Sequence, residues 1–281
     1  MRRSPIRLRP GLSLLTLASL SVACLLVLFP IYWVVVTSLK DAREIFASPP
    51  VFWPGRFAFE NYANMWNASA IPKYFLNTVV VAASSIACIL LFSSMAAYAL
   101  TRFSFRGRTV FLLSLLVGQI MPLTTLIIPL YLFWASVRML DTHTVLIVNY
   151  AAFGIPAGVW LMTGFMKSIP RELDEAARMD GAGTFLILTK VVMPLSQPGL
   201  VATGLSTLFW IWQELMISMT FVISDDKKML MAGVSTFITS RGIRWGELTA
   251  AGVAVILPVF VLYLLLRKAL VKGLTSGAMK G

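Results

Sequence analysis

The residues with the clearest chemical pattern lie in a polar stretch, residues 175–194, between two long apolar segments. Its distinctive residues are acidic, small or helix-breaking: Glu175, Ala176, Ala177, Asp180, Gly181 and Pro194. On a helix, Ala177 and Gly181 share one face, which lets another backbone approach closely, and Glu175 offers an acceptor. The pattern predicts docking to a partner protein. The alternative is an ordinary amphipathic loop helix on the membrane surface.

A second group of polar residues lies inside the apolar segments. Glu214 is the one charged residue well inside such a segment, where a carboxylate costs about 2.5–3.5 kcal/mol. It therefore either lines a substrate path or subunit interface, or it is hydrogen-bonded to a neighbouring helix. The other candidates for a path are Gln213, Asn149 and Tyr150, while Asn77 and Gln119 are weaker polar candidates.

We predict no catalytic, cofactor-binding or metal site. His143, the single histidine, lies beside Asp141 without further ligands nearby. No G-x-x-x-x-G-K-[ST] phosphate loop occurs, so ATP-driven work would need another chain. Cys24 and Cys88 both fall in apolar segments, which argues against a disulfide framework.

The elements that position these residues are membrane helices. The chain has 281 residues, of which 58% are hydrophobic and 13% charged, against about 25% charged in soluble domains. Six apolar segments are each near the roughly 20 residues that span a bilayer. They cover residues 13–37, 75–100, 109–135, 144–166, 199–223 and 247–266. The fold class predicted is an all-α integral membrane protein, with no strands in its spans.

Charge placement predicts the orientation. With the N-terminus inside, fifteen of the 24 basic residues fall on the inner side with four acidic ones, against nine and seven outside. The positive-inside rule then puts both termini and residues 175–194 in the cytoplasm. It also explains the net charge of +12 without nucleic acid. Within the inner loop, we expect a helix over residues 171–182, with Pro170 at its start and Gly181 at its end.

The inner loop resembles the EAA loop of ABC importer permeases. The family pattern is EAA, three residues, Gly, nine residues, then Ile-x-Leu-Pro, and here the last part reads Val191-Val192-Met193-Pro194. Further segments are similar to the MalG-like carbohydrate branch, although Gln213 stands where Asn is more frequent. These segments are Thr37-Ser38-Leu39-Lys40, Asn61-Tyr62, Ala97-Tyr98-Ala99-Leu100, Arg102-Phe103, Trp212-Gln213-Glu214 and residues 273–281.

The resemblance implies a type I ABC importer permease fold with a cytoplasmic coupling helix. It implies a heterodimer with a second permease subunit, two ATPase subunits at the EAA loop and C-terminal tail, and an external substrate-binding protein. ATP and Mg would be held by the ATPase subunits. The expected cargo is a di- or oligosaccharide or a related polyol derivative, carried across the cytoplasmic membrane of a bacterium or archaeon. Trp160, Trp210, Trp212 and Tyr150 would either pack or stack on a sugar.

Other interpretations remain open at this point. A secondary transporter or channel acting without an ATPase would need ion-coupling groups, and only Glu214 qualifies. A membrane scaffold is a third possibility. We divide the chain into a cytoplasmic tail (1–12), a first helix with external loop (13–74), a core permease domain (75–266) and a second tail (267–281). Aromatic residues in the external loop form either an interfacial belt or a cap for an external partner.

Overall fold

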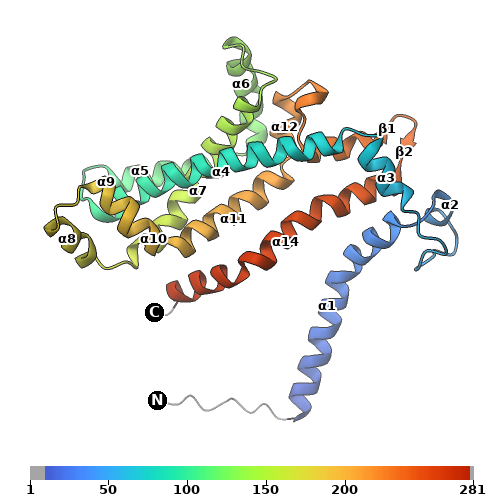
Figure 1. The fold of residues 1–281 in the computed structure, drawn as a ribbon, viewed down its shortest axis with the longest axis horizontal. Helices are drawn as coiled ribbons and strands as arrows, with labels where there is room; N and C mark the ends of the chain where they lie inside the picture. The colour runs from blue at the N-terminus through green and yellow to red at the C-terminus, as the bar shows by residue number, and fades with distance from the viewer. Residues whose placement is uncertain (1–9, 279–281) are drawn as a thin grey trace. The chain divides into compact units, whose positions relative to one another are not determined.

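A computed structural model describes the backbone of residues 10–278 and the side chains of residues 14–266. The predicted N-terminal tail up to residue 9 and residues 279–281 of the predicted C-terminal tail lie outside the described residues. The α-helices are α1 Pro10–Ser38, α2 Ala42–Ile45, α3 Glu60–Asn67, α4 Ile71–Arg102, α5 Arg108–Ile120, α6 Leu123–Ser136, α7 His143–Lys167, α8 Glu172–Met179, α9 Thr184–Ile187, α10 Met193–Leu195, α11 Gln197–Gln213, α12 Met216–Phe221, α13 Leu230–Val234 and α14 Trp245–Ala278 (Figure 1). A π-helical turn, Leu188–Val192, joins α9 to α10. Strands β1 Ile238–Thr239 and β2 Gly242–Ile243 pair as an antiparallel hairpin.

The predicted all-helical membrane fold is confirmed. Four helices of the described chain are long and apolar enough to cross a bilayer. They are Leu14–Ser38, Ile71–Arg102, His143–Lys167 and Trp245–Leu266. Two bent helix pairs raise the number of spans to six if each pair counts as one.

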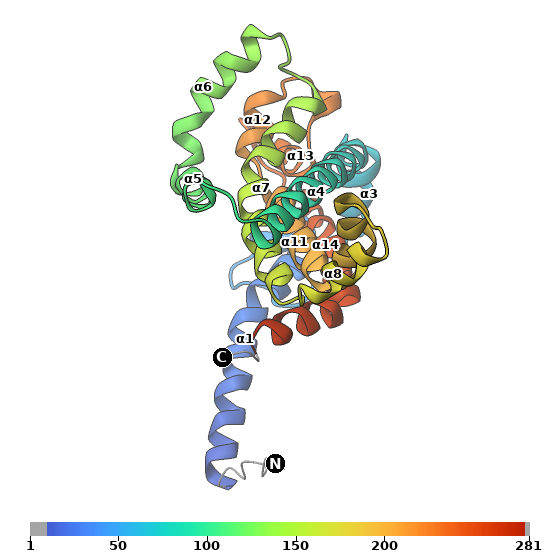
Figure 2. The same ribbon diagram turned by 90° about the vertical axis from the view of Figure 1, so that its left-hand side faces the viewer.

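The predicted span over residues 109–135 is present as a bent helix pair, which is broken after Ile120. Helices α5 and α6 meet at an angle of 96°, which Figure 2 shows as a sharp bend. Pro122 disfavours helical backbone at the residue before it, and Met121 is accordingly extended, with φ −67° and ψ 123°.

The predicted span over residues 199–223 is also corrected. Helix α11 ends at Gln213, Glu214 has extended backbone with ψ 128°, and the short helix α12 follows. On its N-terminal side, α11 meets the preceding helical segment, Thr184–Leu195, at 79°.

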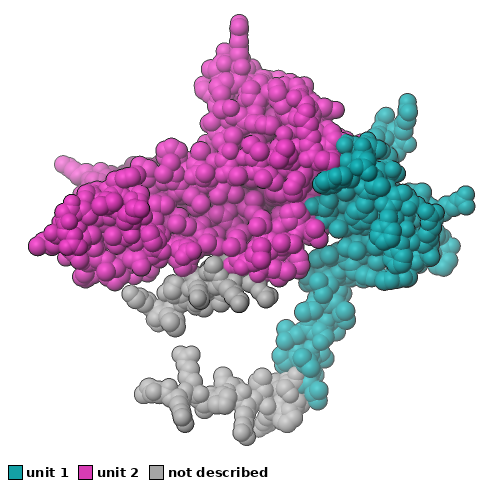
Figure 3. All heavy atoms as spheres, viewed as in Figure 1, with its two compact units in different colours: residues 1–69, 237–254 teal, residues 70–236, 255–281 magenta. Residues whose placement is uncertain are grey.

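The chain forms two compact units, coloured separately in Figure 3. The first contains the chain up to Ser69 together with Phe237–Ala254, and the second contains Ala70–Thr236 with the chain from Val255 onward. The four-part division made from the sequence stays a prediction.

In the first unit, two sequence segments meet in one polar cluster. Asn61 donates its side-chain amide to the carbonyls of Ser38 and Lys40 at 3.0 and 2.9 Å, and the Tyr62 and Ser38 hydroxyls lie 2.7 Å apart. The Lys40 ammonium donates to the Val51 carbonyl, and its burial lowers the pKa of Lys40. These contacts fix the external loop against the end of α1.

Aromatic side chains of this loop remain on its surface. Trp53 packs edge-on against Phe57, which stacks on Phe59, with ring centroids 6.0 Å apart in both pairs. All three are exposed, as are Phe52 and Trp66. Both the belt and the external-partner interpretations stay predictions.

The second unit is built around helices α4, α7 and α11, which run side by side (Figure 1). Gly154 and Gly158 lie one turn apart on α7 and face α4. A Cβ added at Gly158 would lie 3.0 Å from Ser93 Cβ, and one at Gly154 only 2.4 Å from Ile89 Cδ1. These small residues let the two helix backbones approach closely, as is typical of membrane helix pairs.

Candidate functional site

The predicted coupling helix is present as α8, although it is shorter than the 171–182 expected. It covers eight residues and is followed by Asp180 and by Gly181, whose φ of +82° is left-handed. Such a backbone favours glycine and ends a helix. Helices α8 and α9 lie near the end of α4 (Figure 1).

A buried ion pair fixes α8 to α4. The Arg102 guanidinium lies 3.0 Å from the Asp174 carboxylate, and the two side chains are only 4% and 5% exposed. Tyr98 donates its hydroxyl to the same carboxylate at 3.2 Å, and Arg102 also donates to the Ile169 carbonyl at 3.2 Å. The sequence did not predict this pair, although Tyr98 and Arg102 both lie in segments that resemble the carbohydrate branch. Because buried charges need partners, α8 is held in one position on α4.

The predicted coupling residues divide into two groups. Exposed members are Glu175, Ala176, Asp180, Gly181 and Pro194. Ala177 is half-buried and packs against a cluster of the chain's own buried residues: Ala97, Tyr98, Met162, Met166, Ile169, Ile187, Leu188 and Val192. The expectation that Ala177 and Gly181 together face a partner is therefore revised, since Ala177 mainly seats α8 on the helices below it.

Exposed apolar side chains surround the loop and were missed from the sequence. Met179 is 89% exposed and Phe185 69% exposed, while Leu173, Leu186 and Leu195 are also exposed. These residues could have been noticed in the sequence, because they are apolar residues within the otherwise polar loop of residues 167–198. Clustered exposed apolar residues mark interaction surfaces. We name Leu173, Met179, Phe185 and Leu186 the apolar rim of the loop.

Glu214 holds the break between α11 and α12. Its carboxylate accepts hydrogen bonds from the Tyr150 hydroxyl at 2.9 Å, and from the backbone N–H groups of Ile217 at 2.9 Å and Ser218 at 3.3 Å. It thus binds the otherwise unpaired amides at the start of α12. This geometry agrees with the interpretation of Glu214 as hydrogen-bonded to a neighbouring helix.

The remaining predicted path residues do not share one cavity. Tyr150 is fully buried, and its ring packs edge-on against Trp210. Asn149 is also buried and donates to the Val145 carbonyl at 2.8 Å. Gln213 is exposed and lines a separate hollow with Trp212 and side chains of α14.

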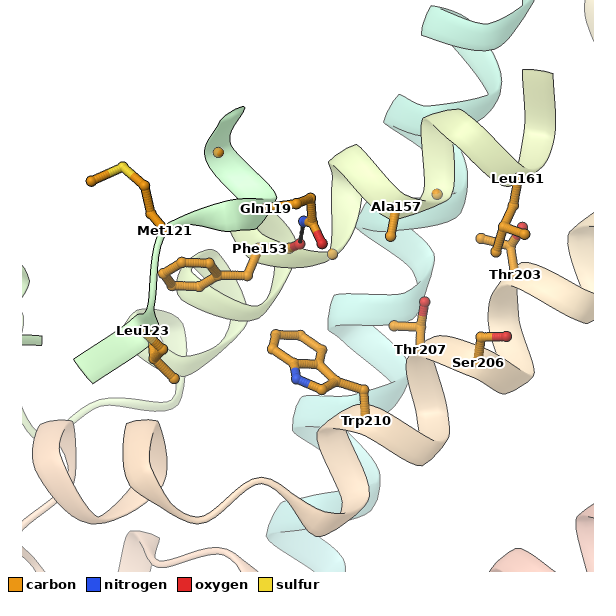
Figure 4. A pocket seen from close by; sticks show the side chains of 13 residues that line it. Gln119, Met121, Leu123, Phe153, Ala157, Leu161, Thr203, Ser206, Thr207 and Trp210 are labelled. Atoms are coloured by element: carbon orange, nitrogen blue, oxygen red, sulfur yellow. Dashed lines mark hydrogen bonds between the residues drawn. The ribbon is translucent and has the colours of Figure 1, made fainter. Parts of the chain in front are cut away.

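A different cavity lies among α5, α6, α7 and α11, with a volume of about 280 Å³ (Figure 4). Its residues are Gly118, Gln119, Met121, Leu123, Phe153, Gly154, Ala157, Gly158, Leu161, Thr203, Ser206, Thr207 and Trp210. The Gln119 amide nitrogen donates to the Phe153 carbonyl at 2.9 Å, which joins the bent pair to α7. Of the path candidates considered from the sequence, Gln119 and Trp210 lie here.

Asp141 joins the turn before α7 to the segment after α12. It accepts from the Ser224 hydroxyl, from the N–H groups of Ser224 and Ile223 at 2.9 and 3.0 Å, and from the Lys227 ammonium at 3.1 Å. The Ser224 hydrogen bonds, with these others, hold the pKa of Asp141 well below its usual range. His143 lies 3.1 Å from the Lys227 carbonyl, so its contact is structural.

The helical fold, with four to six candidate membrane spans among the described residues, is that of a membrane permease. The family described as "Binding-protein-dependent transport system inner membrane component" matches residues 89–276, and the chain belongs to this family. It is a transport subunit and not itself an enzyme.

Individual proteins agree with this assignment. The chain is 32% identical over 257 residues to the diacetylchitobiose uptake system permease protein NgcG of Streptomyces coelicolor, covering 91% of this chain and 85% of that protein. It is 31% identical to the trehalose/maltose transport system permease protein MalG of Thermococcus litoralis, covering 90% and 92%. Its fold is similar to a chain of a bacterial ABC transporter involved in the import of the acidic polysaccharide alginate, with a TM-score of 0.82, 23% identity and coverage of 94% and 99%.

Proposed function

We propose that this chain carries a di- or oligosaccharide, or a related sugar derivative, across the cytoplasmic membrane, with both termini inside. Relatives at 31–32% identity over nine-tenths of the chain are named for uptake of diacetylchitobiose and of trehalose/maltose, which supports a carbohydrate cargo. Transport driven by a separate ATPase is supported by α8, because this helix is exposed on one side and fixed by a buried ion pair on the other.

We propose the following assembly. A second permease subunit completes the pathway, two ATPase subunits bind the inner loops and C-terminal tail, and an external binding protein delivers the sugar. ATP and Mg are held by the ATPase subunits. Glu175, Ala176, Asp180, Gly181 and the apolar rim contact an ATPase subunit, while Ala177 and Pro194 shape the loop that presents them.

The geometry supports a direct mechanical connection. When the ATPase pair closes on ATP, it displaces α8, and the Arg102–Asp174 pair passes that displacement to α4. Helix α7 packs closely on α4 through Gly154 and Gly158, so it follows. The pathway then changes between inward-open and outward-open states without any change in the covalent structure of the sugar.

Two glycines in the loop provide a matched test of coupling. Gly181 has φ +82°, whereas Gly183 has an ordinary extended backbone, and a Cβ at either position meets nothing within 4 Å. Gly181→Val should abolish ATP-driven uptake because valine disfavours the left-handed backbone. Gly183→Val should leave uptake nearly unchanged. Both variants are compared in proteoliposomes containing the complete transporter, at equal amounts of protein.

The rim supplies an independent test by copurification. Met179→Asp and Phe185→Asp should release the ATPase subunits in mild detergent, since each places a charge in an apolar contact. Retention of the ATPase subunits by both variants, with normal uptake, would contradict the docking surface. Sugar uptake by this chain in liposomes without any ATPase would instead establish a secondary transporter or channel.

A further inference from the structure

One face of α11 combines hydroxyl groups with an aromatic ring. Thr203, Ser206, Thr207 and Trp210 follow one another at helical spacing and all line the 280 Å³ cavity (Figure 4). This volume is close to the lower limit of roughly 300–1,000 Å³ for small-molecule sites. Ser206 is exposed, so the cavity opens on one side.

The hydroxyl of Thr203 has no partner among the residues that the structure describes. It is buried, with the residue 1% exposed, and its oxygen makes no hydrogen bond. Four other buried hydroxyls of the same unit, those of Thr78, Ser85, Ser93 and Thr101, donate to the carbonyl one turn earlier. The hydroxyls of Ser94, Thr163, Ser196 and Ser218 also lack a partner, but none of these residues lines the cavity. A buried hydroxyl without a partner is costly. The Thr203 oxygen is closed to solvent, so a ligand in the cavity reaches it only when the surrounding side chains move.

The opposite wall adds backbone and an amide. Gly154, Ala157 and Gly158 of α7 line it. The nitrogen of Gln119 is held by the Phe153 carbonyl at 2.9 Å, which fixes the amide plane at the edge of the cavity. Neutral hydroxyls, an amide and an indole face are the groups that bind sugar hydroxyls and the apolar face of a sugar ring.

None of the 13 residues lining this cavity carries a charge. A carboxylate or sulfonate entering it would lose water without gaining a cation from this chain, which is strongly unfavourable. The lining therefore favours an uncharged ligand.

We propose that this cavity is a direct sugar-contacting site, in which Thr203, Thr207 and Trp210 bind an uncharged saccharide and disfavour an acidic one. This inference rests on the proposed carbohydrate function. The proposed contact residues thus differ from the candidates Glu214, Gln213, Asn149 and Tyr150, none of which lines the cavity. Tyr150 packs against Trp210 and is hydrogen-bonded to Glu214, so both support the lining from outside it.

The test uses the complete transporter in proteoliposomes, with its ATPase subunits and binding protein. Uptake of radiolabelled maltose, diacetylchitobiose and an alginate oligosaccharide is measured for the native chain and for Thr203→Val and Thr207→Val. Each substitution keeps the side-chain shape and removes one hydroxyl. We expect import of a neutral sugar, with a KM for uptake raised about three- to tenfold in each variant. ATP hydrolysis stimulated by the loaded binding protein should stay at the native level.

Thr163→Val is the matched control. Thr163 is also a buried threonine whose hydroxyl has no partner among the described residues, but it lies on α7 outside the cavity. Its variant should keep the native KM. Because valine for an unpartnered threonine removes an unsatisfied group, loss of folding is not expected, and equal unfolding midpoints confirm this.

The possible results distinguish the proposed carbohydrate function from the proposed sugar contacts in the cavity. Import of none of these saccharides by an assembled, ATP-hydrolysing transporter contradicts the carbohydrate function itself. Import of a neutral sugar with unchanged KM in both cavity variants contradicts the site alone. Preferred import of the alginate oligosaccharide contradicts the selection against charge.

Discussion

At the residue scale, the most consequential contacts are those of two carboxylates that the fold buries for different purposes. Asp174 neutralises Arg102 at the C-terminal end of α4, and Glu214 binds the first amides of α12. The sequence indicated that Glu214 was unusual, because it is a charge within an apolar segment. Asp174 was not conspicuous, because a loop carboxylate is ordinary until folding buries it.

The Arg102–Asp174 pair predicts an asymmetric mutational response. Arg102→Met should lower the free energy of unfolding by about 3–5 kcal/mol, because it leaves a buried carboxylate unpaired. The double variant Arg102→Met with Asp174→Leu should recover much of this loss. Thermal unfolding of the purified protein in detergent measures both. Equal losses of unfolding free energy in the single and double variants would show that the ion pair does not stabilise the contact between α4 and α8.

Glu214 is predicted to act through structure, not through contact with the sugar. Glu214→Ala should lower the free energy of unfolding by about 1–3 kcal/mol, because buried donors lose their acceptor. Tyr150→Phe should cost less, because it removes one of the three hydrogen bonds. Glu214→Gln keeps an acceptor and should keep the native KM for uptake. A KM raised tenfold in Glu214→Gln, with the native unfolding midpoint, would place Glu214 in the path.

At the element scale, the number and order of apolar segments were predictable, but their internal breaks were not. Pro122 was a visible signal, although proline in a membrane helix is often tolerated. The end of α11 depends on Glu214 accepting from Tyr150, 64 residues away, which no local pattern contains. Likewise, Ala177 was correctly placed on a helix but its orientation depends on the cluster beneath it.

The close approach of α4 and α7 provides a matched pair of substitutions on one helix. Gly158→Leu should lower the free energy of unfolding by about 1–3 kcal/mol, because its side chain meets Ser93 and Ile89. Gly164 of the same helix is exposed with nothing within 4 Å of an added Cβ. Gly164→Leu should therefore be neutral or slightly stabilising. Unfolding midpoints in detergent compare the two, and equal midpoints would contradict close packing at Gly158.

The connection made by Asp141 predicts a pH dependence. Its pKa is lowered in the folded state, so the stability it contributes is present above the unfolded value of about 3.9 and is lost as the pH falls below that. Asp141→Asn should lower the unfolding midpoint at pH 7 by on the order of 2–4 °C, and the difference should shrink in strong acid. Asparagine tolerates the φ of +59° at this position. Asp225→Asn, at a largely exposed carboxylate, is the control.

At the scale of the whole molecule, family membership and the helical fold agree with what the sequence predicted, while the orientation of the termini stays a prediction. The sequence could propose a docking surface because residues 175–194 resemble the EAA pattern of the family. It could not identify the cavity, because Thr203, Thr207 and Gln119 come from different helices and look unremarkable individually. Their relation exists only after the bend at Pro122 and the packing of α11 on α7.

The orientation can be tested by cysteine labelling. With Cys24 and Cys88 replaced by alanine, a membrane-impermeant maleimide applied to intact cells with a permeable outer envelope should label Phe59→Cys but not Met179→Cys. Both native side chains are well exposed, so access depends on the side of the membrane. Disruption of the cells should expose Met179→Cys. Labelling of Met179→Cys in intact cells would reverse the predicted topology.

The Arg102–Asp174 pair also has a consequence for biogenesis. The two residues are 72 positions apart, so at a synthesis rate of roughly 5–20 residues per second Arg102 waits on the order of several seconds for its partner. During that interval its charge can be solvated only at the membrane surface, which is the cytoplasmic surface in the proposed orientation. With that orientation, we expect the same guanidinium first to retain the C-terminal end of α4 during insertion and later to pair with Asp174 of α8.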